Sequence, residues 1–346
     1  MLTDPLRTAT LSLDLDDKWS YLKVAGIEGW ERFPSYLDRV VPLALESLDA
    51  AGLRCTWFLV GSDAAQSRHG ADLRSIVSSG HTVGNHSMVH EPWLHLYSPE
   101  RLESEIREAE EAIVGATGHR PTAFRGPGFS WSETLFEVLL ARGYAFDAST
   151  LPTYLAGVAR AYYAARTRLT RAQMIERKAL FGSWRDGRRP LKPYRWTLQS
   201  GSTFLEIPVT TIPGIRAPFH LSYLLWLSRY SDALAMGYLH AALSACRLAG
   251  VAPSVLLHPL DFLGTDDVSG LEFFPAMELP GARKRDLVQR VLTAVKAAFP
   301  VSDLATVGTA ISKLPAGAIP ERAIDWRHDI PVAASANAGT QPLEAA

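Results

Sequence analysis

The feature that most constrains the fold is an alternation, across the first 150 residues, of short apolar runs with longer amphipathic segments. The apolar runs end in polar residues, and the segments between them show the three-and-four spacing that is typical of helices. This rhythm predicts repeated β–α units around a parallel sheet. The expected strands are 9–15, 54–61, 81–85, 123–126, 144–148, 203–210 and 254–260, with a further one near 299–308, and the clearest expected helices are 36–52 and 98–118.

The length of 346 residues fits a single α/β barrel with insertions, so we expect one domain over residues 1–325. Two segments break the rhythm. Residues 152–200 are expected to form a basic helical insertion after the fifth strand, because residues 160–195 contain eleven Lys or Arg against two acidic residues. Residues 326–346, rich in Ala with Gly, Pro, Asn and Gln, are expected to be a disordered tail.

Charge and cysteine content narrow the class of protein. The formal net charge of −1 argues against nucleic-acid binding, so any basic surface has to be local. The basic and aromatic segment 160–195 is either a solvated helix pair or a platform for an anionic substrate or a membrane surface. Cys55 and Cys246 lack a metal-site spacing and are interpreted as buried thiols of a reducing compartment, and the N-terminus lacks the pattern of a secretory signal. We therefore expect a cytoplasmic protein, peripheral at the inner face of the membrane if the basic segment contacts lipid, and the oligomeric state is left open.

Two short motifs offer metal ligands. His86 and His90, in GHTVGNHSMVHE, would share one face if the chain were helical there, and such a pair can bind a divalent ion. The motif LSLDLDD ends an apolar run with Asp14, Asp16 and Asp17, and alternation places the first two on one face. Two carboxylates beside a histidine pair suit a division in which one binds metal and one stays free as a base. Each motif alone is equally compatible with a turn, a cap or a surface pair.

Together these motifs resemble the second and first motifs of the polysaccharide deacetylases, carbohydrate esterase family four. Three further motifs follow in the family's order: FRGPGFS at 124–130, FDAST at 146–150 and LLHP at 256–259. The resemblance extends over roughly residues 10–262. It implies a deformed (β/α) barrel of seven or eight strands and a divalent metal cofactor, with zinc preferred over cobalt, nickel and similar ions.

The resemblance also implies how a metal and a base would be held. Asp16, His86 and His90 would bind the ion and leave open positions for water and the substrate carbonyl. Asp14 would be the general base, and Arg125 would orient it and hold it ionised.

The remaining motifs imply an acid and an oxyanion site. His258 would protonate the leaving amine, with Asp147 as the partner that aims its imidazole. A backbone N–H in the turn at 127–128 would stabilise the tetrahedral oxyanion. Trp93 and Trp131 are candidates for stacking on a sugar ring, with core packing as the alternative. The candidate substrate-binding residues are thus Pro127, Gly128, Trp93 and Trp131.

Three departures from the common family pattern leave details open. The first motif has the spacing Asp-x-Asp-Asp, so the base and ligand are either Asp14 and Asp16, which we prefer, or Asp16 and Asp17. Gly126 replaces a frequent proline, and Thr150 stands where tryptophan is common. The identities of the acyl group and of the sugar are therefore not predicted.

These observations predict a metal-dependent hydrolase that removes an N-acyl group, preferably acetyl, from a substrate that contains an amino sugar. A lipid-linked sugar or an exopolysaccharide precursor would suit the basic, aromatic segment. One alternative is hydrolysis of another linear amide, of the deformylase, ureide or imide type. The other is an inactive barrel that binds sugar or lipid, which would be expected to have lost catalytic residues; all five motifs here keep a chemically competent side chain.

Overall fold

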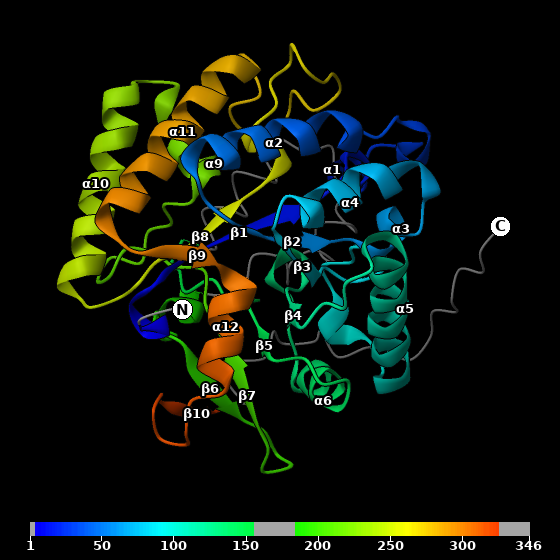
Figure 1. Cartoon of the computed structure of the whole chain (residues 1–346), viewed down its shortest axis with the longest axis vertical. Helices are drawn as coiled ribbons and strands as arrows, with labels where there is room; N and C mark the ends of the chain where they lie inside the picture. The colour runs from blue at the N-terminus through cyan, green and yellow to red at the C-terminus, as the bar shows by residue number, and fades with distance from the viewer. Residues whose placement is uncertain (1–3, 156–183, 325–346) are drawn as a thin grey trace.

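The computed structural model describes residues 4–155 and 184–324, in which a mostly parallel sheet is surrounded by helices (Figure 1). The strands are β1 Ala9–Leu15, β2 Thr56–Leu59, β3 Thr82–Asn85, β4 Ala123–Phe124, β5 Phe146–Asp147, β6 Tyr194–Thr197, β7 Thr203–Glu206, β8 Ser254–Leu257, β9 Val301–Asp303 and β10 Glu321–Ala323. Their order in the sheet is β10-β6-β7-β5-β4-β3-β2-β1-β8, and β9 pairs with β1. β6 is antiparallel to β7 and β10 is parallel to β6, while the other eight strands share one direction.

This architecture confirms the predicted fold class. Each strand expected from an apolar run is present within its expected segment, and β1 has the expected bounds. The eight strands of common direction agree with the expected seven or eight, whereas β6 and β10 were not expected. In the part of the chain that the structure describes, no strand pairing joins β10 to β8, so the barrel is open there.

Local sequence signals explain the helix bounds. The helices are α1 Lys18–Ala25, α2 Leu37–Ala51, α3 Gly61–Ala64, α4 Gly70–Ser78, α5 Pro99–Thr117, α6 Glu133–Ala141, α9 Leu221–Ser228, α10 Asp232–Leu248, α11 Gly281–Ala298 and α12 Leu304–Ser312. Helix α5 begins as predicted, because the Ser98 hydroxyl accepts the N–H of Arg101. It ends at Gly118, whose φ of 73° is one that glycine adopts without strain.

These helices form an arc along the sheet. Successive contacts run from α6 to α5, α4, α2, α11 and α10, and Figure 1 shows this arrangement. Alternate residues of β1, namely Leu11, Leu13 and Leu15, pack in the core beneath these helices. The intervening residues of β1 therefore face the other side of the sheet, because side chains alternate along a strand. Among them are Ser12 and Asp14.

The edge of the sheet at which the eight parallel strands end is called here the carboxyl edge. The loops that follow β1, β3, β4, β5 and β8 all leave from this edge. Each of the five sequence motifs begins on or just before one of these strands and continues into the loop that follows it. Parallel pairing thus brings together motifs that are far apart in the sequence, as in other barrels of this class.

Two predicted segments lie largely outside the described residues. The central part of the expected basic insertion, residues 156–183, and the expected tail, residues 326–346, are not described. At the end of the 152–200 segment the chain forms a short 3-10 helix, Trp184–Arg188, and then strand β6. Among the described helices, including α9 and α10 within the apolar region 220–250, none is both long and apolar enough to cross a membrane.

Candidate active site

Asp16 and the two motif histidines form a compact group at the carboxyl edge. Oδ1 of Asp16 lies 3.4 Å from Nε2 of His86 and 3.1 Å from Nε2 of His90. All three side chains are buried, and their potential ligand atoms lie within 4.8 Å of one another. The structure therefore brings together the three residues that the sequence proposed as metal ligands.

The histidine pair does not lie on a helix, contrary to the expectation from its spacing. Residues 86–90 form a loop after β3, in which Ser87 and His90 have positive φ angles of 66° and 52°. These left-handed residues curl the chain so that the ring centroids of His86 and His90 are 5.0 Å apart. Such backbone conformations are costly for residues other than glycine and often occur at functional sites. A turn, rather than helical periodicity, unites the two imidazoles.

A hydrogen bond fixes the ring of His86. Its Nδ1 lies 2.6 Å from the carbonyl oxygen of Arg125, so Nδ1 carries the proton and donates it. Nε2, which faces Asp16, is therefore left with its lone pair in the neutral ring. A hydrogen bond from the ring nitrogen that does not bind the metal commonly orients histidine ligands.

These three residues fit a divalent metal ion. Oδ1 of Asp16 is buried and has no hydrogen-bond partner among the described residues, even though two imidazoles approach it. Burial would raise the pKa of Asp16, but His90 and His86 outweigh this and hold it well below its usual range. Burial likewise opposes charge on His86, yet the carboxylates of Asp14 and Asp16 raise its pKa. The pocket thus favours positive charge, and two nitrogens with one oxygen are a common donor set for zinc.

Asp17 points away from this group. Its Oδ1 accepts the backbone N–H groups of Lys18 and Tyr36, at 2.6 and 3.1 Å, and thereby caps α1. Asp17 also approaches Asp63 and His69 in a second buried group, but there Arg68 donates to the His69 ring. The geometry favours Asp16 over Asp17 as the ligand beside the histidine pair.

Asp14 and Arg125 form a buried ion pair next to this group. Nη1 of Arg125 donates to Oδ1 of Asp14 at 2.7 Å and to the hydroxyl of Ser12 at 2.9 Å. Nε of Arg125 donates to the carbonyl of Ala148 at 3.0 Å, which locks the guanidinium in place. The structure thus pairs these two residues as the sequence predicted.

The turn that follows Arg125 depends on Gly126. A Cβ at Gly126 would lie 1.9 Å from the carbonyl oxygen of Ser130, so no other residue fits without a change of backbone. The turn continues as a short 3-10 helix, Pro127–Phe129, in which Gly128 has a φ of 60°. Gly128 is exposed, whereas Pro127 is buried. The departure from the common family pattern at Gly126 therefore has a steric cause.

His258 directly follows β8 and is oriented by Ser222 and Asp261. Its Nδ1 is 3.4 Å from the hydroxyl of Ser222, which donates to Oδ1 of Asp261 at 3.1 Å. The other oxygen of Asp261 accepts the backbone N–H of His258 at 2.7 Å. Asp261 was not predicted, although its spacing from His258 is that of a helix capping box.

The expected contact between Asp147 and His258 is not what the structure shows. Among the hydrogen bonds and ion pairs of the described residues, none links these two side chains. Asp147 instead accepts the N–H and the hydroxyl of Ser149, at 3.0 and 2.7 Å, and Ser149 Oγ accepts the N–H of Gly126 at 2.7 Å. Asp147 therefore holds the turn after Arg125 in place through Ser149.

The prediction failed here because Asp147 has a distant partner that the sequence does not reveal. Asp147 and Glu206 face each other from adjacent strands, β5 and β7, and both are fully buried. Burial raises the pKa of Glu206 well above its usual range, and the Asp147 charge adds to this. Burial also raises the pKa of Asp147.

The two candidate tryptophans differ in position. Trp131 is 6% exposed and packs against Phe136 and Trp196, which also contact each other, and the Arg189 guanidinium lies 4.7 Å from its ring centroid. This burial favours core packing, the alternative to sugar stacking, for Trp131. Trp93 is half-buried against the same aromatic cluster and remains a candidate for contact with substrate.

Sequence reasoning also missed three residues beside the site. The hydroxyl of Tyr36 donates to the carbonyl of Asp16 at 2.6 Å, which helps to fix the end of β1. Tyr21 has a buried hydroxyl close enough to Asp16 for burial and the acidic charges to raise its pKa well above the usual range. His220 lies near His258, with ring centroids 6.0 Å apart. None of the three belongs to a motif with a characteristic spacing.

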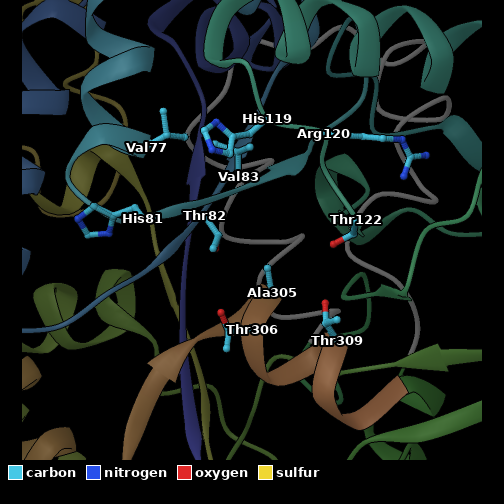
Figure 2. A pocket seen from close by; sticks show the side chains of 10 residues that line it. All are labelled: Val77, His81, Thr82, Val83, His119, Arg120, Thr122, Ala305, Thr306 and Thr309. Atoms are coloured by element: carbon cyan, nitrogen blue, oxygen red, sulfur yellow. The ribbon is translucent and has the colours of Figure 1, made fainter. Parts of the chain in front are cut away.

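A separate cavity of about 360 Å³ lies at the opposite edge of the sheet. Figure 2 shows its walls, with His81 and Thr82 at the start of β3 on one side and Thr306 and Thr309 of α12 below. The ring of His81 accepts the backbone N–H of Cys55, and burial lowers its pKa to about 4, so its role is structural. No predicted site residue lines this cavity, so it is not part of the candidate site.

Comparisons with known sequences agree with the motifs. A family model described as polysaccharide deacetylase matches residues 15–146. A peptidoglycan deacetylase of Helicobacter pylori is 28% identical over 111 residues, which are 32% of this chain and 37% of that protein. A peptidoglycan-N-acetylglucosamine deacetylase of Listeria monocytogenes is 33% identical over 88 residues, 25% of this chain and 18% of that protein. The chain thus aligns with less than two-fifths of the length of either relative.

Two solved structures share the fold over most of its length. A protein from Mycobacterium smegmatis classed with the polysaccharide deacetylases gives a TM-score of 0.57 at 18% identity, over 91% of this chain and 94% of that one. Puue allantoinase gives a TM-score of 0.53 at 15% identity, over 88% and 90% of the respective chains. At these identities the likeness concerns the fold. The family model confirms the resemblance to polysaccharide deacetylases, and the structures confirm the fold class.

Proposed function

Because residues 15–146 match the polysaccharide deacetylase family, we propose that this protein is a metal-dependent hydrolase that removes an N-acyl group, preferably acetyl, from an amino-sugar substrate. The observation that carries the proposal is the group formed by Asp16, His86 and His90, with the Asp14–Arg125 pair beside it. The two relatives named as deacetylases act on peptidoglycan, which contains N-acetylated sugars. A carbohydrate amide is therefore the substrate class to test first.

The roles of the residues follow from their positions. When bound by Asp16, His86 and His90, a divalent ion, preferably zinc, would supply a Lewis acid that polarises the acyl carbonyl and lowers the pKa of water. Asp14 takes the proton from the attacking water, since it is held beside this group by Arg125. Arg125 keeps the Asp14 carboxylate aimed and compensates its charge in a buried site.

The acid and the oxyanion site complete the proposed reaction. His258 protonates the leaving nitrogen, and Ser222 with Asp261 aims its ring. The exposed backbone at Gly128 supplies an N–H to the developing oxyanion. The Asp147–Ser149 contact holds this turn, because Ser149 Oγ accepts the N–H of Gly126. Asp147 thus acts in the proposal as a positioning residue.

Release of acetate from N-acetylglucosamine oligosaccharides tests the proposal directly. The assay compares the wild type with and without a strong chelator, and with the metal restored. We expect hydrolysis that the chelator abolishes and that zinc or a similar ion restores. The same panel includes ureides, cyclic imides and N-formyl amides. Turnover confined to those compounds would replace the sugar substrate, whereas bound metal without hydrolysis of any amide would indicate a binding protein.

We further propose that the amino sugar is lipid-linked and is met at the inner face of a membrane, by a cytoplasmic protein. Support comes from exposed apolar side chains in segments that leave the carboxyl edge: Trp184 is 54% exposed and Ile215 is 64% exposed. Tyr154 lies against Gly187 and near Arg216, so these segments are neighbours. Apolar and basic side chains together favour an anionic lipid surface.

Sedimentation with vesicles of phosphatidylglycerol and phosphatidylcholine tests this finer proposal. We expect the wild type to bind the anionic vesicles and Trp184→Ser to bind them less. Tyr230→Ser, an exposed aromatic residue between α9 and α10, is the matched control and should bind like the wild type. Equal sedimentation of all three proteins would exclude Trp184 as the lipid contact, and no sedimentation of the wild type would exclude a lipid surface; either result leaves the hydrolase proposal intact.

A further inference from the structure

His220 is a buried histidine at the rim of the candidate site that no motif assigns. It lies in the segment between β7 and α9 and occupies the position before the first residue of α9. Its side chain is only 7% exposed. A histidine so placed has either a packing role or a role toward a ligand, and its contacts distinguish the two.

The surroundings of His220 connect it to the proposed acid. Its ring centroid is 6.0 Å from that of His258, and the edge of Tyr223 packs against it with centroids 4.8 Å apart. Burial lowers the pKa of His220 to about 3, and the nearby positive charges of His258 and Arg125 add to this. The ring is therefore neutral near pH 7, and it offers one hydrogen-bond donor and one acceptor.

One nitrogen of this neutral ring is unsatisfied. Nδ1 of His220 is buried and has no hydrogen-bond partner among the described residues. Buried polar atoms are nearly always paired, because an unpaired one loses the hydrogen bonds that water would supply. Packing alone does not explain a nitrogen at this position, since a phenylalanine would fill the space without that cost.

We propose that His220 is a substrate-binding residue whose Nδ1 forms a hydrogen bond with a hydroxyl group of the sugar that bears the scissile amide. This inference rests on the proposed function. In that reaction His258 contacts the leaving nitrogen, so a residue beside His258 meets the ring atoms next to the carbon that carries the nitrogen. Those atoms carry hydroxyls in an amino sugar, and a neutral imidazole can donate to or accept from a hydroxyl.

The inference separates sugar amides from simpler ones. A site that forms a hydrogen bond to a substrate hydroxyl discriminates against analogues that lack it, because its own polar group is then left unpaired. His220 would thus contribute to specificity for amino sugars over acyclic amides without a hydroxyl. It would contribute nothing to the hydrolysis of an acyclic N-acetyl amine.

The test replaces His220 by Phe, which keeps a ring of similar size, and by Gln, which keeps a donor and an acceptor. With an N-acetylglucosamine oligosaccharide we expect His220→Phe to lose roughly 10- to 100-fold in kcat/KM, and His220→Gln to recover part of this. The thermal midpoint of His220→Phe should equal or exceed that of the wild type, because the change removes an unsatisfied buried atom. His240→Phe, on the exposed face of α10, is the matched control and should change neither quantity.

Substrates that lack single hydroxyls identify the contact. The wild type should lose activity with the 3-deoxy analogue, which lacks the hydroxyl next to the amide-bearing carbon, and His220→Phe should lose nothing further with it; the 4-deoxy and 6-deoxy analogues are the controls. Additive losses with every analogue, or a fall in thermal midpoint that accounts for the lost activity, would overturn the inference. If the wild type hydrolyses no sugar amide, the proposed function fails by itself. In that case the wild type and the same variants are titrated calorimetrically with N-acetylglucosamine tetrasaccharide. Weaker binding by His220→Phe alone would uphold the inference. Equal binding by all the proteins, or no binding by the wild type, would overturn it.

Discussion

Two pairs of buried acids lie at the carboxyl edge of the same sheet, and the structure treats them in opposite ways. Asp14 and Asp16, at the end of β1, face a guanidinium and two imidazoles. Asp147 and Glu206, on β5 and β7, face each other. Asp147 accepts hydrogen bonds from the N–H and hydroxyl of Ser149, and Glu206 accepts them from those of Thr150. Both pairs are withdrawn from water, so burial alone does not separate them.

The difference lies in the positive charge that each pair meets. The imidazoles overcome the effect of burial on Asp16, and its pKa falls well below the usual range. For Glu206 burial and the neighbouring Asp147 act in the same direction, and its pKa rises. Asp16 is therefore ionised and suited to a cation, with Asp14 held beside it by Arg125, while the second pair retains a proton and supports the backbone. Position at a strand end does not by itself make a carboxylate catalytic.

The largest expected effect comes from removing the proposed base. Asp14→Asn keeps the shape of the side chain but cannot accept a proton at neutral pH. We expect kcat for acetate release to fall by about 10²- to 10⁴-fold, the usual contribution of general base catalysis, with metal content unchanged. The matched change in the second pair, Asp147→Asn, should reduce kcat far less, because Asp147 acts only through the turn. Equal losses in the two variants would remove the distinction between the pairs.

Loss of the positive charge of Arg125 should strongly lower the stability of the folded protein. Arg125→Met keeps much of the buried volume but leaves Asp14 without its partner. Breaking a buried ion pair in this way typically costs about 3–5 kcal/mol in the free energy of unfolding. Urea denaturation followed by circular dichroism measures it. Arg107→Met, in an exposed ion-pair cluster on α5, is the control and should alter stability little.

The strands at which these pairs sit could be predicted from sequence, but the pairing of the acids could not. The alternation of apolar residues gave β1 its bounds and placed Asp14 and Asp16 on one face, as the structure shows. The partner of Asp147 is Glu206, 59 positions later in the sequence. It lies on β7, which pairs with β5 only in the folded chain, so no local sequence pattern predicts the contact. Reversed strands β6 and β10 were missed for a similar reason, since their pairing is decided by tertiary contact.

The acid pair at β5 and β7 should make stability depend on pH. The raised pKa of Glu206 means that the folded protein holds a proton which the unfolded chain releases above pH ~4.3. Stability should therefore fall as pH rises from that value toward the folded pKa, by up to about 1.4 kcal/mol per pH unit for one proton. Below pH ~4.3 both states are protonated and this contribution vanishes.

Glu206→Gln isolates this contribution, because Gln is neutral and its oxygen can still accept from Thr150. We expect the unfolding free energy of the variant to be less dependent on pH between 5 and 8 and to exceed that of the wild type at the upper end. Chemical denaturation at a series of pH values gives the slopes. Parallel slopes for the two proteins would show that Glu206 is ionised in the fold.

The smallest expected effect concerns the orientation of the proposed acid. Asp261→Asn keeps one oxygen to accept the His258 N–H, but it places an amide NH2 group where the other oxygen accepts the Ser222 hydroxyl. The imidazole of His258 is then aimed less firmly at the leaving nitrogen. We expect a loss of kcat of about tenfold or less at neutral pH. An unchanged kcat would mean that Asp261 serves only to cap the turn.

Metal content tests the central claim most directly: that counter-charge, and not position, makes the first pair the active one. The measurement is the number of divalent ions per chain, by inductively coupled plasma mass spectrometry after dialysis, for the wild type, Asp16→Ala and Glu206→Ala. The account predicts one ion per chain in the wild type and in Glu206→Ala, and none in Asp16→Ala. Retention of the ion by a folded Asp16→Ala, or its loss from a folded Glu206→Ala, would contradict it.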